Sequence, residues 1–410
     1  MPVIIAAMIS SSEDKMDAQY LRTARRNKIW LDSESGTFEE FARLVSQTAN
    51  PADWPFASEI VQNVLIYEGS TVREAAQDRQ TRSELMAEWV EAFTSGPGVI
   101  VIKDALPDHS VIDRATAIFN QIIDDQHRTK SGGGDHFAKP GANDRIWNSL
   151  EKHCLADPEN FARYFASDAI ALPSEAWLGV GYQMTAQVNR VNPGGAAQTS
   201  HRDYHLGFMK PAQMMAYPAH IHGVSPVLTL QGAVAHGDMP VESGPTMLLP
   251  YSQAFFEGYL AFGRPEFQNY FAQNYVQLPL RKGDALFFNP ALMHGAGHNK
   301  STDIQRMANL LQVSSAFGRA METVNRDRMV NALYPVLLAG VPGLSTSGLA
   351  NAIAASAEGY PFPTNLDRDP PVGGLAPKTQ AVRLHDALRE GKSAEDFAKE
   401  MAAYAISRET

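Results

Sequence analysis

The chain has 410 residues, of which 44% are hydrophobic and 20% are charged, as expected of a globular protein that can bury a substantial core. Lysine and arginine total 35 against 45 acidic residues, and the net charge of −10 argues against a nucleic-acid-binding surface. The one cysteine, Cys154, excludes an intrachain disulfide framework and a thiolate zinc cluster, and it fits a cytoplasmic protein. The sequence has neither a basic N-terminal signal segment nor an apolar stretch of the roughly 18 residues that a membrane helix needs, so we expect no membrane partner.

Residues 1–80 are expected to form a mostly helical extension that carries no chemical motif. A helix is predicted next, because residues 81–84 resemble a capping box and apolar residues follow them at helical spacing. The Gly-Pro-Gly sequence at 96–98 would end this helix, and residues 99–102 then predict a buried strand. The apolar residues from Val111 to Ile122 again recur at helical spacing.

From about residue 176 to 318, short apolar segments alternate with Gly, Pro and Asn turns, which is typical of a sandwich or jelly roll. Strands are expected at residues 182–190, 225–235, 247–249, 277–280, 285–288 and 307–313. Residues 319–410 return to helical periodicity. We therefore expect a mainly β core at 81–318 with its leading helices, flanked by helical extensions at 1–80 and 319–410, all packed as one unit.

A candidate metal site lies in the predicted β region. Residues two apart in an extended strand point to the same face, so His201 and Asp203 would present their side chains together. His-x-Asp is common by itself, but a second histidine, His294, follows the Gly283-Asp284 turn and an aromatic strand. Two histidines and one carboxylate can occupy one face of an octahedral ion and leave three adjacent positions open, which is the facial triad of non-heme Fe(II) oxygenases.

Other histidines compete as metal ligands. The His-x-His pair at 220–222 could hold zinc on a strand, although no third ligand stands in an obvious register with it. His298 competes with His294, but it is expected in a loop beside Asn299 rather than at a strand end. The position of His294 at the end of a strand favours it as the third ligand.

The residues around His294 carry a specific resemblance. Residues 282–301 read Lys-Gly-Asp-Ala-Leu-Phe-Phe-Asn-Pro-Ala-Leu-Met-His-Gly-Ala-Gly-His-Asn-Lys-Ser, and Arg306 follows. With the central segment at 232–252 and the strand at 98–102, this ordered set resembles the phytanoyl-CoA dioxygenase family of Fe(II)/2-oxoglutarate oxygenases over roughly residues 84–318. The resemblance implies a double-stranded β-helix, a cupin-like jelly roll, flanked by helices.

The resemblance also implies roles for individual residues. His201, Asp203 and His294 would bind Fe(II) as the catalytic centre and leave room for the co-substrate 2-oxoglutarate and for O2. Arg306 would anchor the C5 carboxylate of 2-oxoglutarate. Further candidates are Gln187, Gln231 and Asn299 for the co-substrate, and Arg145, Lys139 and Tyr204 for the substrate, although the two basic groups would equally suit a solvated surface.

The sequence departs from the family pattern at Ala296, where a small hydroxyl residue is common, and in an insertion around residues 219–222. The expected activity is hydroxylation or a related oxidation of a C–H bond of a small organic substrate, with release of succinate and CO2. Related halogenases lack the carboxylate that Asp203 provides, so its presence favours hydroxylation or a related oxidation. The alternatives are a jelly-roll metalloenzyme that uses Zn or Mn for non-oxidative chemistry, and a non-catalytic binding protein. A small molecule is the expected partner, nucleic acid is not, and a homo-oligomer is left open.

Overall fold

Two sheets form the centre of the molecule in the computed structural model, which describes residues 17–129 and 141–409. The large mixed sheet has eight strands in the order β1-β2-β3-β8-β6-β10-β5-β4, and the small sheet pairs β7 with β9. The strands are β1 (Glu59–Val61), β2 (Val64–Glu68), β3 (Val99–Lys103), β4 (Asn143–Ile146), β5 (Gln183–Val191), β6 (Thr229–Ala235), β7 (Met247–Leu248), β8 (Ala285–Phe288), β9 (His294–Gly295) and β10 (Arg306–Ser314).

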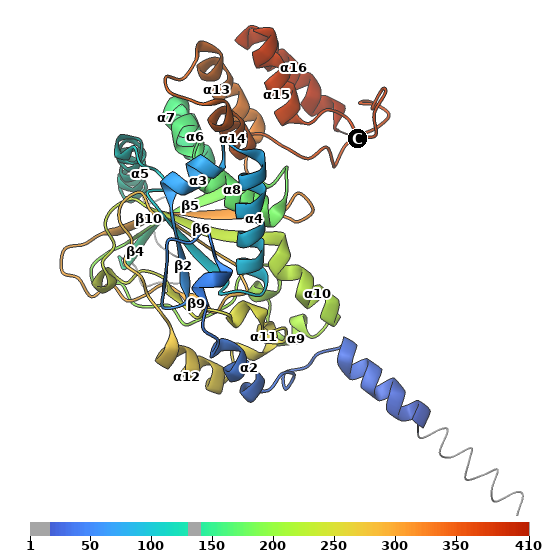
Figure 1. Cartoon of the computed structure of the whole chain (residues 1–410). Helices are drawn as coiled ribbons and strands as arrows, with labels where there is room; N and C mark the ends of the chain where they lie inside the picture. The colour runs from blue at the N-terminus through green and yellow to red at the C-terminus, as the bar shows by residue number, and fades with distance from the viewer. Residues whose placement is uncertain (1–16, 130–140, 410) are drawn as a thin grey trace, which may run out of the picture.

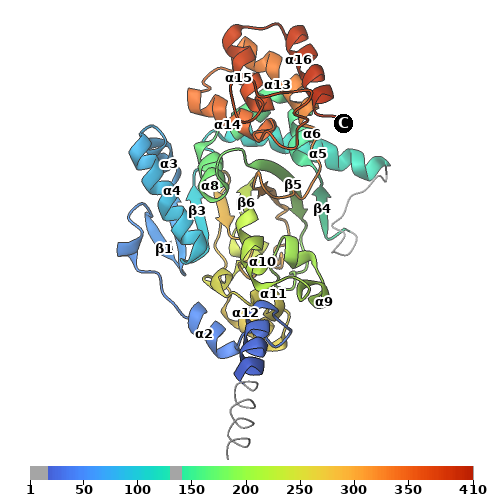
Figure 2. The same ribbon diagram turned by 90° about the vertical axis from the view of Figure 1, so that its right-hand side faces the viewer.

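Helices surround the large sheet, and α13 to α16 gather at one end of the molecule (Figures 1 and 2). The helices are α2 (Phe38–Val45), α3 (Gly69–Ala75), α4 (Arg79–Thr94), α5 (His109–Thr129), α6 (Ser149–Ala156), α7 (Pro158–Phe165), α8 (Asp168–Leu178), α9 (Pro211–Met214), α10 (Ala219–Val224), α11 (Gly258–Ala261), α12 (Pro265–Asn274), α13 (Arg326–Ala339), α14 (Thr346–Ser356), α15 (Gln380–Glu390) and α16 (Ala394–Ser407). Residues 17–29 are also helical and project from the rest of the chain (Figure 1). No helix of the described residues is both long and apolar enough to span a membrane.

One face of the large sheet is covered by helices. Side chains alternate along a strand, and in β5 the residues Met184, Ala186 and Val188 point to this face. They belong to a large hydrophobic cluster that also contains Trp89 of α4 and Leu333 of α13. Burial of this cluster stabilises the sheet and ties the helices before and after it to one core.

The other face of the large sheet looks toward the small sheet. Val101, Leu286 and Phe288 on this face pack with Leu248 of β7 and with Leu280 in a second, smaller hydrophobic cluster. The interior between the two sheets is therefore apolar at the β3–β8 side. Toward β5 and β4 the same face carries polar side chains, which face the site described below.

The expectation of a mainly β chain is corrected by the structure. Helices account for 48% of the described residues and strands for only 14%, although the sheets are of the double-stranded β-helix type that the resemblance implies. The strands are short, and α5 to α8 intervene between β3 and β5 to cover the sheet. The sheet also begins earlier than expected, because β1 and β2 fall within the segment 1–80 that was predicted to be mostly helical.

Candidate metal centre and active site

A short antiparallel pairing brings the candidate ligands together. His201 and His294 form a backbone bridge in which each N–H donates to the other residue's carbonyl, with N···O distances of 2.9 and 3.1 Å. The Asp203 N–H donates to the Pro290 carbonyl at 2.8 Å, so the His-x-Asp segment runs beside the chain that leads into β9. Because β9 also pairs with β7, the ligands stand on the small sheet, facing the large one.

The ligand atoms of His201, Asp203 and His294 lie within 4.8 Å of one another. The two Nε2 atoms are 3.7 Å (His201) and 3.5 Å (His294) from the nearest carboxylate oxygen of Asp203. Within residues 17–129 and 141–409, this is the one group of three or more His, Cys, Asp or Glu side chains that could hold a metal ion.

Backbone carbonyls fix the tautomers of both histidines. Nδ1 of His201 lies 2.9 Å from the Thr199 carbonyl, and Nδ1 of His294 lies 2.8 Å from the Leu292 carbonyl. A carbonyl only accepts, so each Nδ1 carries the proton and donates it, which leaves the Nε2 lone pair free toward Asp203. Metal-binding histidines in proteins are generally held in this way.

Asp203 is held by Gln231 of β6, whose side-chain N–H donates to Oδ2 at 2.7 Å. Burial raises the pKa of Asp203, but hydrogen bonding and charge from His294, together with His201 and Gln231, outweigh it and leave the pKa below its usual value. Burial, followed by the charge of His294, lowers the pKa of His201 despite the opposite influence of Asp203. The site thus favours a carboxylate beside a neutral imidazole, which are the forms that bind a metal ion.

Arg306 is a buried cation without an acidic partner in the described part of the chain. It opens β10, opposite Val191 of β5, and one guanidinium N–H donates to the Gly244 carbonyl. No carboxylate of the described residues lies within 4.0 Å of the guanidinium. Burial lowers its pKa to about 10. A buried charge is costly unless it is paired, so this position favours an anionic ligand.

A family model described as phytanoyl-CoA dioxygenase (PhyH) matches residues 81–308. The chain belongs to this family. PhyH proteins are 2-oxoglutarate-dependent non-heme iron enzymes, so the protein is an enzyme of that class with iron and 2-oxoglutarate as its cofactors. The membership also implies a small-molecule substrate. A comparison with curated proteins gave no match.

Several solved structures are similar to the chain. SnoN, a non-heme alpha ketoglutarate dependent epimerase from nogalamycin biosynthesis, is 19% identical with a TM-score of 0.38, over 58% of this chain and 84% of SnoN. The carbocyclase SnoK of the same biosynthesis is 19% identical with a TM-score of 0.37, over 54% and 80%. AviO1 from Streptomyces viridochromogenes Tue57 is 18% identical with a TM-score of 0.40, over 57% and 97%.

The amides suggested by the PhyH resemblance occupy different surroundings. Gln231 contacts Asp203 directly, as described above. Gln187 lies on the same face of the sheet in β5, where its side-chain N–H is 3.4 Å from the sulfur of Met321. Asn299 is fully buried, and its N–H groups donate to the carbonyls of Val191 and Ile304 at 3.1 and 2.8 Å. Its amide therefore holds the turn before Arg306.

Two of the three substrate candidates can be placed. Tyr204 is buried directly after Asp203, and its hydroxyl donates to the side-chain oxygen of Gln312. Its φ of 51° is unusual for a residue other than glycine, and such strain gathers at functional sites. Arg145 lies in β4, where its guanidinium carbon is 5.5 Å from the centre of the Trp147 ring. Lys139 lies outside the described residues.

The competing histidines are placed away from the three ligands. His220 and His222 lie in α10 rather than on a strand. Two residues apart in a helix, their side chains point to nearly opposite sides of it and cannot bind one metal ion together. His222 Nε2 is 3.1 Å from the Met214 carbonyl, and His220 is exposed. His298 is exposed beside Asn299.

The residue between the two ligands of the first segment was missed at the sequence level. Arg202 is almost fully buried, donates to the Ser252 carbonyl and lies 5.6 Å from the centre of the Tyr259 ring. The Tyr259 hydroxyl donates to the Asp203 carbonyl at 3.0 Å. These contacts fix the ligand segment to the corner formed by residues 250–259. A buried arginine is rare, but only the fold shows what surrounds it.

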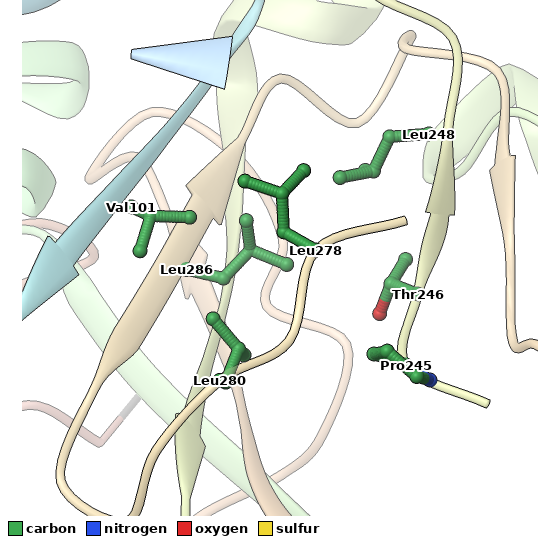
Figure 3. A pocket seen from close by; sticks show the side chains of 7 residues that line it. All are labelled: Val101, Pro245, Thr246, Leu248, Leu278, Leu280 and Leu286. Carbon is green, nitrogen blue, oxygen red and sulfur yellow. The ribbon is translucent and has the colours of Figure 1, made fainter. Parts of the chain in front are cut away.

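Beyond the ligands, the interior between the sheets is closed by apolar side chains. Figure 3 shows these side chains pointing toward one another. The cavity between them has a volume of about 10 Å³, large enough for a single water at most. It is lined by Val101, Pro245, Thr246, Leu248, Leu278, Leu280 and Leu286. This side of the interior therefore has no room for a substrate.

Proposed function

We propose that the protein is an Fe(II)/2-oxoglutarate-dependent dioxygenase that oxidises a C–H bond of a small organic substrate, most simply by hydroxylation, and releases succinate and CO2. The observation that carries the proposal is the meeting of His201, Asp203 and His294, whose ligand atoms lie within 4.8 Å of one another. Two imidazoles and one carboxylate are the donor set of the facial triad.

The side chains fit the cofactors. Two Nε2 lone pairs and a carboxylate suit Fe(II), and the buried cation of Arg306 suits the far carboxylate of 2-oxoglutarate, which it can pair with bidentately. When bound, Fe(II) supplies the redox chemistry that couples O2 and 2-oxoglutarate to oxidation of the substrate.

The remaining residues would position these groups. The carbonyls of Thr199 and Leu292 hold the imidazoles, and Gln231 holds Asp203 by a hydrogen bond. Such contacts set the orientation and basicity of metal ligands. We assign Asn299 to holding the turn before Arg306, and Gln187 to the lining of the substrate side.

The test measures succinate. Purified protein with Fe(II), ascorbate and 2-oxoglutarate should form succinate on addition of substrates from a panel of small metabolites, and His201→Ala or Asp203→Ala should abolish it. The exposed His220 lies in α10 away from the site, so His220→Ala is the matched control and should retain activity. Succinate formation that survives in both ligand variants, or product formed equally well with Zn(II) and without O2, would contradict the proposal.

A further inference from the structure

Two charged side chains stand on the polar face of the large sheet, toward β5 and β4. Arg145 in β4 pairs in register with Asn189 in β5, while its neighbours Asp144 and Ile146 are buried toward the opposite face. Alternation along β5 puts Asn189 on the same face as Gln187 and Thr185. Thr185 is linked through Gln312 of β10 to Gln231, the residue that contacts Asp203. Arg145 therefore faces the same interior as the metal ligands (β4 and β5 are labelled side by side in Figure 2).

The second charge comes from the chain after β10. Residues 321 and 322 cross β5, where the Met321 sulfur lies 3.4 Å from the side-chain nitrogen of Gln187. Glu322 accepts a hydrogen bond from the Asn148 N–H at 2.6 Å through Oε1, and its carboxylate lies near the Gln187 side chain. Glu322 thus reaches the face of β5 that Arg145 also faces, although 177 residues separate the two in sequence (322 − 145).

Both charged groups retain unused bonding capacity. Nε of Arg145 and Oε2 of Glu322 are buried and have no hydrogen-bond partner among the described residues. In the same part of the chain, neither group has an oppositely charged side chain within 4.0 Å, so they do not form an ion pair with each other. Buried polar groups are nearly always satisfied in folded proteins, and exceptions need an explanation such as a ligand.

The pair also lies close to the metal centre. Tyr204 follows the metal ligand Asp203 directly and is buried. The Tyr204 hydroxyl is bonded to Gln312, in the row of side chains that contains Gln231. A molecule held between the two charges would therefore lie beside the candidate iron ligands.

We propose that Arg145 and Glu322 form the substrate subsite and that the substrate is a small zwitterion, with an anionic group on Arg145 and a cationic nitrogen on Glu322. This inference rests on the function proposed above. The carbon chain between the two charged groups would then be the part presented to the metal centre. Pairing both ends of the substrate fixes its orientation, which is what selective C–H oxidation requires.

The experiment uses unbranched ω-amino acids, from 3-aminopropanoate to 6-aminohexanoate, with butylamine and pentanoate as probes that carry one charge each. Binding is followed under argon by the change in the visible charge-transfer band of the protein loaded with Fe(II) and 2-oxoglutarate. We expect at least one amino acid to bind tenfold or more tightly than both single-charge probes. Arg145→Gln should weaken only probes with a carboxylate, and Glu322→Gln only probes with an ammonium group, each by tenfold or more.

The controls are Arg128→Gln and Glu395→Gln, whose side chains are 74% and 80% exposed and lie outside the site. They should bind every probe as the wild type does. Equal affinity for doubly and singly charged probes, or unchanged affinities in both site variants, would overturn the zwitterion subsite. The charge-transfer band itself separates the two proposals, because its absence in the wild type would contradict the iron and 2-oxoglutarate site, whereas its presence without charge selectivity would contradict only the subsite.

Discussion

Single residues outside the ligand set decide how well the three ligands can bind a metal. Each imidazole is oriented by a carbonyl two residues before it in sequence, and Asp203 is oriented by the amide of Gln231. The sequence could indicate the ligands through the His-x-Asp and Gly-Asp motifs. Gln231 lies on β6, apart from the ligands in sequence, so sequence alone made it only one of several candidates for contacting the co-substrate.

Replacing Gln231 with leucine should weaken Fe(II) binding by roughly 10- to 100-fold, because a partner that orients a ligand is lost. The affinity can be measured by competition with a coloured chelator. Gln121→Leu, on the exposed side of α5, is the control. Unchanged iron affinity in Gln231→Leu would show that the hydrogen bond to Asp203 has no role in metal binding.

Arg306 should control the affinity for 2-oxoglutarate rather than for iron. Loss of two charge-assisted hydrogen bonds in Arg306→Ala should raise the KM for 2-oxoglutarate by on the order of 100-fold. Arg306→Lys keeps the positive charge but not the two parallel N–H donors of the guanidinium, and it should give an intermediate KM. Steady-state kinetics with 2-oxoglutarate as the varied substrate checks this, and an equal KM in all three proteins would place the anchor elsewhere.

At the level of elements, the segment that carries His201 and Asp203 depends on the corner behind it. Arg202 points away from the metal centre and fills the space over Gly258, the first residue of α11. A Cβ added to Gly258 would lie 1.9 Å from the guanidinium carbon of Arg202. Because Arg202 is almost fully buried, it has little room to move aside.

We therefore expect Gly258→Ala to destabilise the protein by about 1–3 kcal/mol and to weaken iron binding, since the ligand segment must shift with Arg202. Gly263→Ala is the matched control, because nothing lies within 4 Å of the added Cβ. Urea denaturation and the iron affinity are measured for both. In an Arg202→Ala background the glycine substitution should cost much less, and a penalty that stays the same there would exclude the proposed clash.

Several elements were predictable because their sequence pattern is local. The strands β3, β5, β8 and β10 lie within two or three residues of the predicted positions. The strands β1 and β2 were not foreseen, since β1 has only three residues and neither strand follows a glycine turn of the kind that precedes β3 and β8. The His-x-Asp segment was expected to be a strand, and it forms a single bridge at His201 instead.

At the scale of the whole molecule, the sheet and its helices share one core that contains two buried histidines. His236 lies between Thr116 and Tyr164, with Nδ1 2.8 Å from the threonine oxygen and Nε2 2.9 Å from the tyrosine oxygen. His153 Nε2 is 2.8 Å from the side-chain oxygen of Asn160. Burial lowers the pKa of His236 to about 3 and that of His153 to about 4.

Acid should therefore destabilise the metal-free protein well above pH 4. Below the usual histidine pKa of about 6.5, these two histidines are protonated in the unfolded chain but stay neutral in the folded chain. The free energy of unfolding therefore falls as the pH drops, by about 2 kcal/mol for each histidine at pH 5. Urea denaturation between pH 7 and pH 5 measures this. The variant His153→Asn/His236→Gln should show a flatter pH dependence, and a slope equal to that of the wild type would contradict the assignment.

The arrangement of distant segments could not be read from the sequence. The family motif predicts the order of the iron ligands, but nothing near residue 322 indicates that the chain after β10 returns to β5. The helical covering between β3 and β5 likewise depends on long-range packing of α5 to α8 rather than on a local signal. Residues that act through tertiary contacts, such as Arg202 and Glu322, therefore emerge only from the structure.

The central claim, one ferrous ion held by His201, Asp203 and His294 together with 2-oxoglutarate, is tested most directly by anaerobic titration. Protein with one equivalent of Fe(II) is titrated with 2-oxoglutarate while the visible charge-transfer band is recorded. We predict a band that saturates at one 2-oxoglutarate per chain and is lost in His201→Ala and His294→Ala. No band in the wild type, or an equal band in the two variants, would contradict the account.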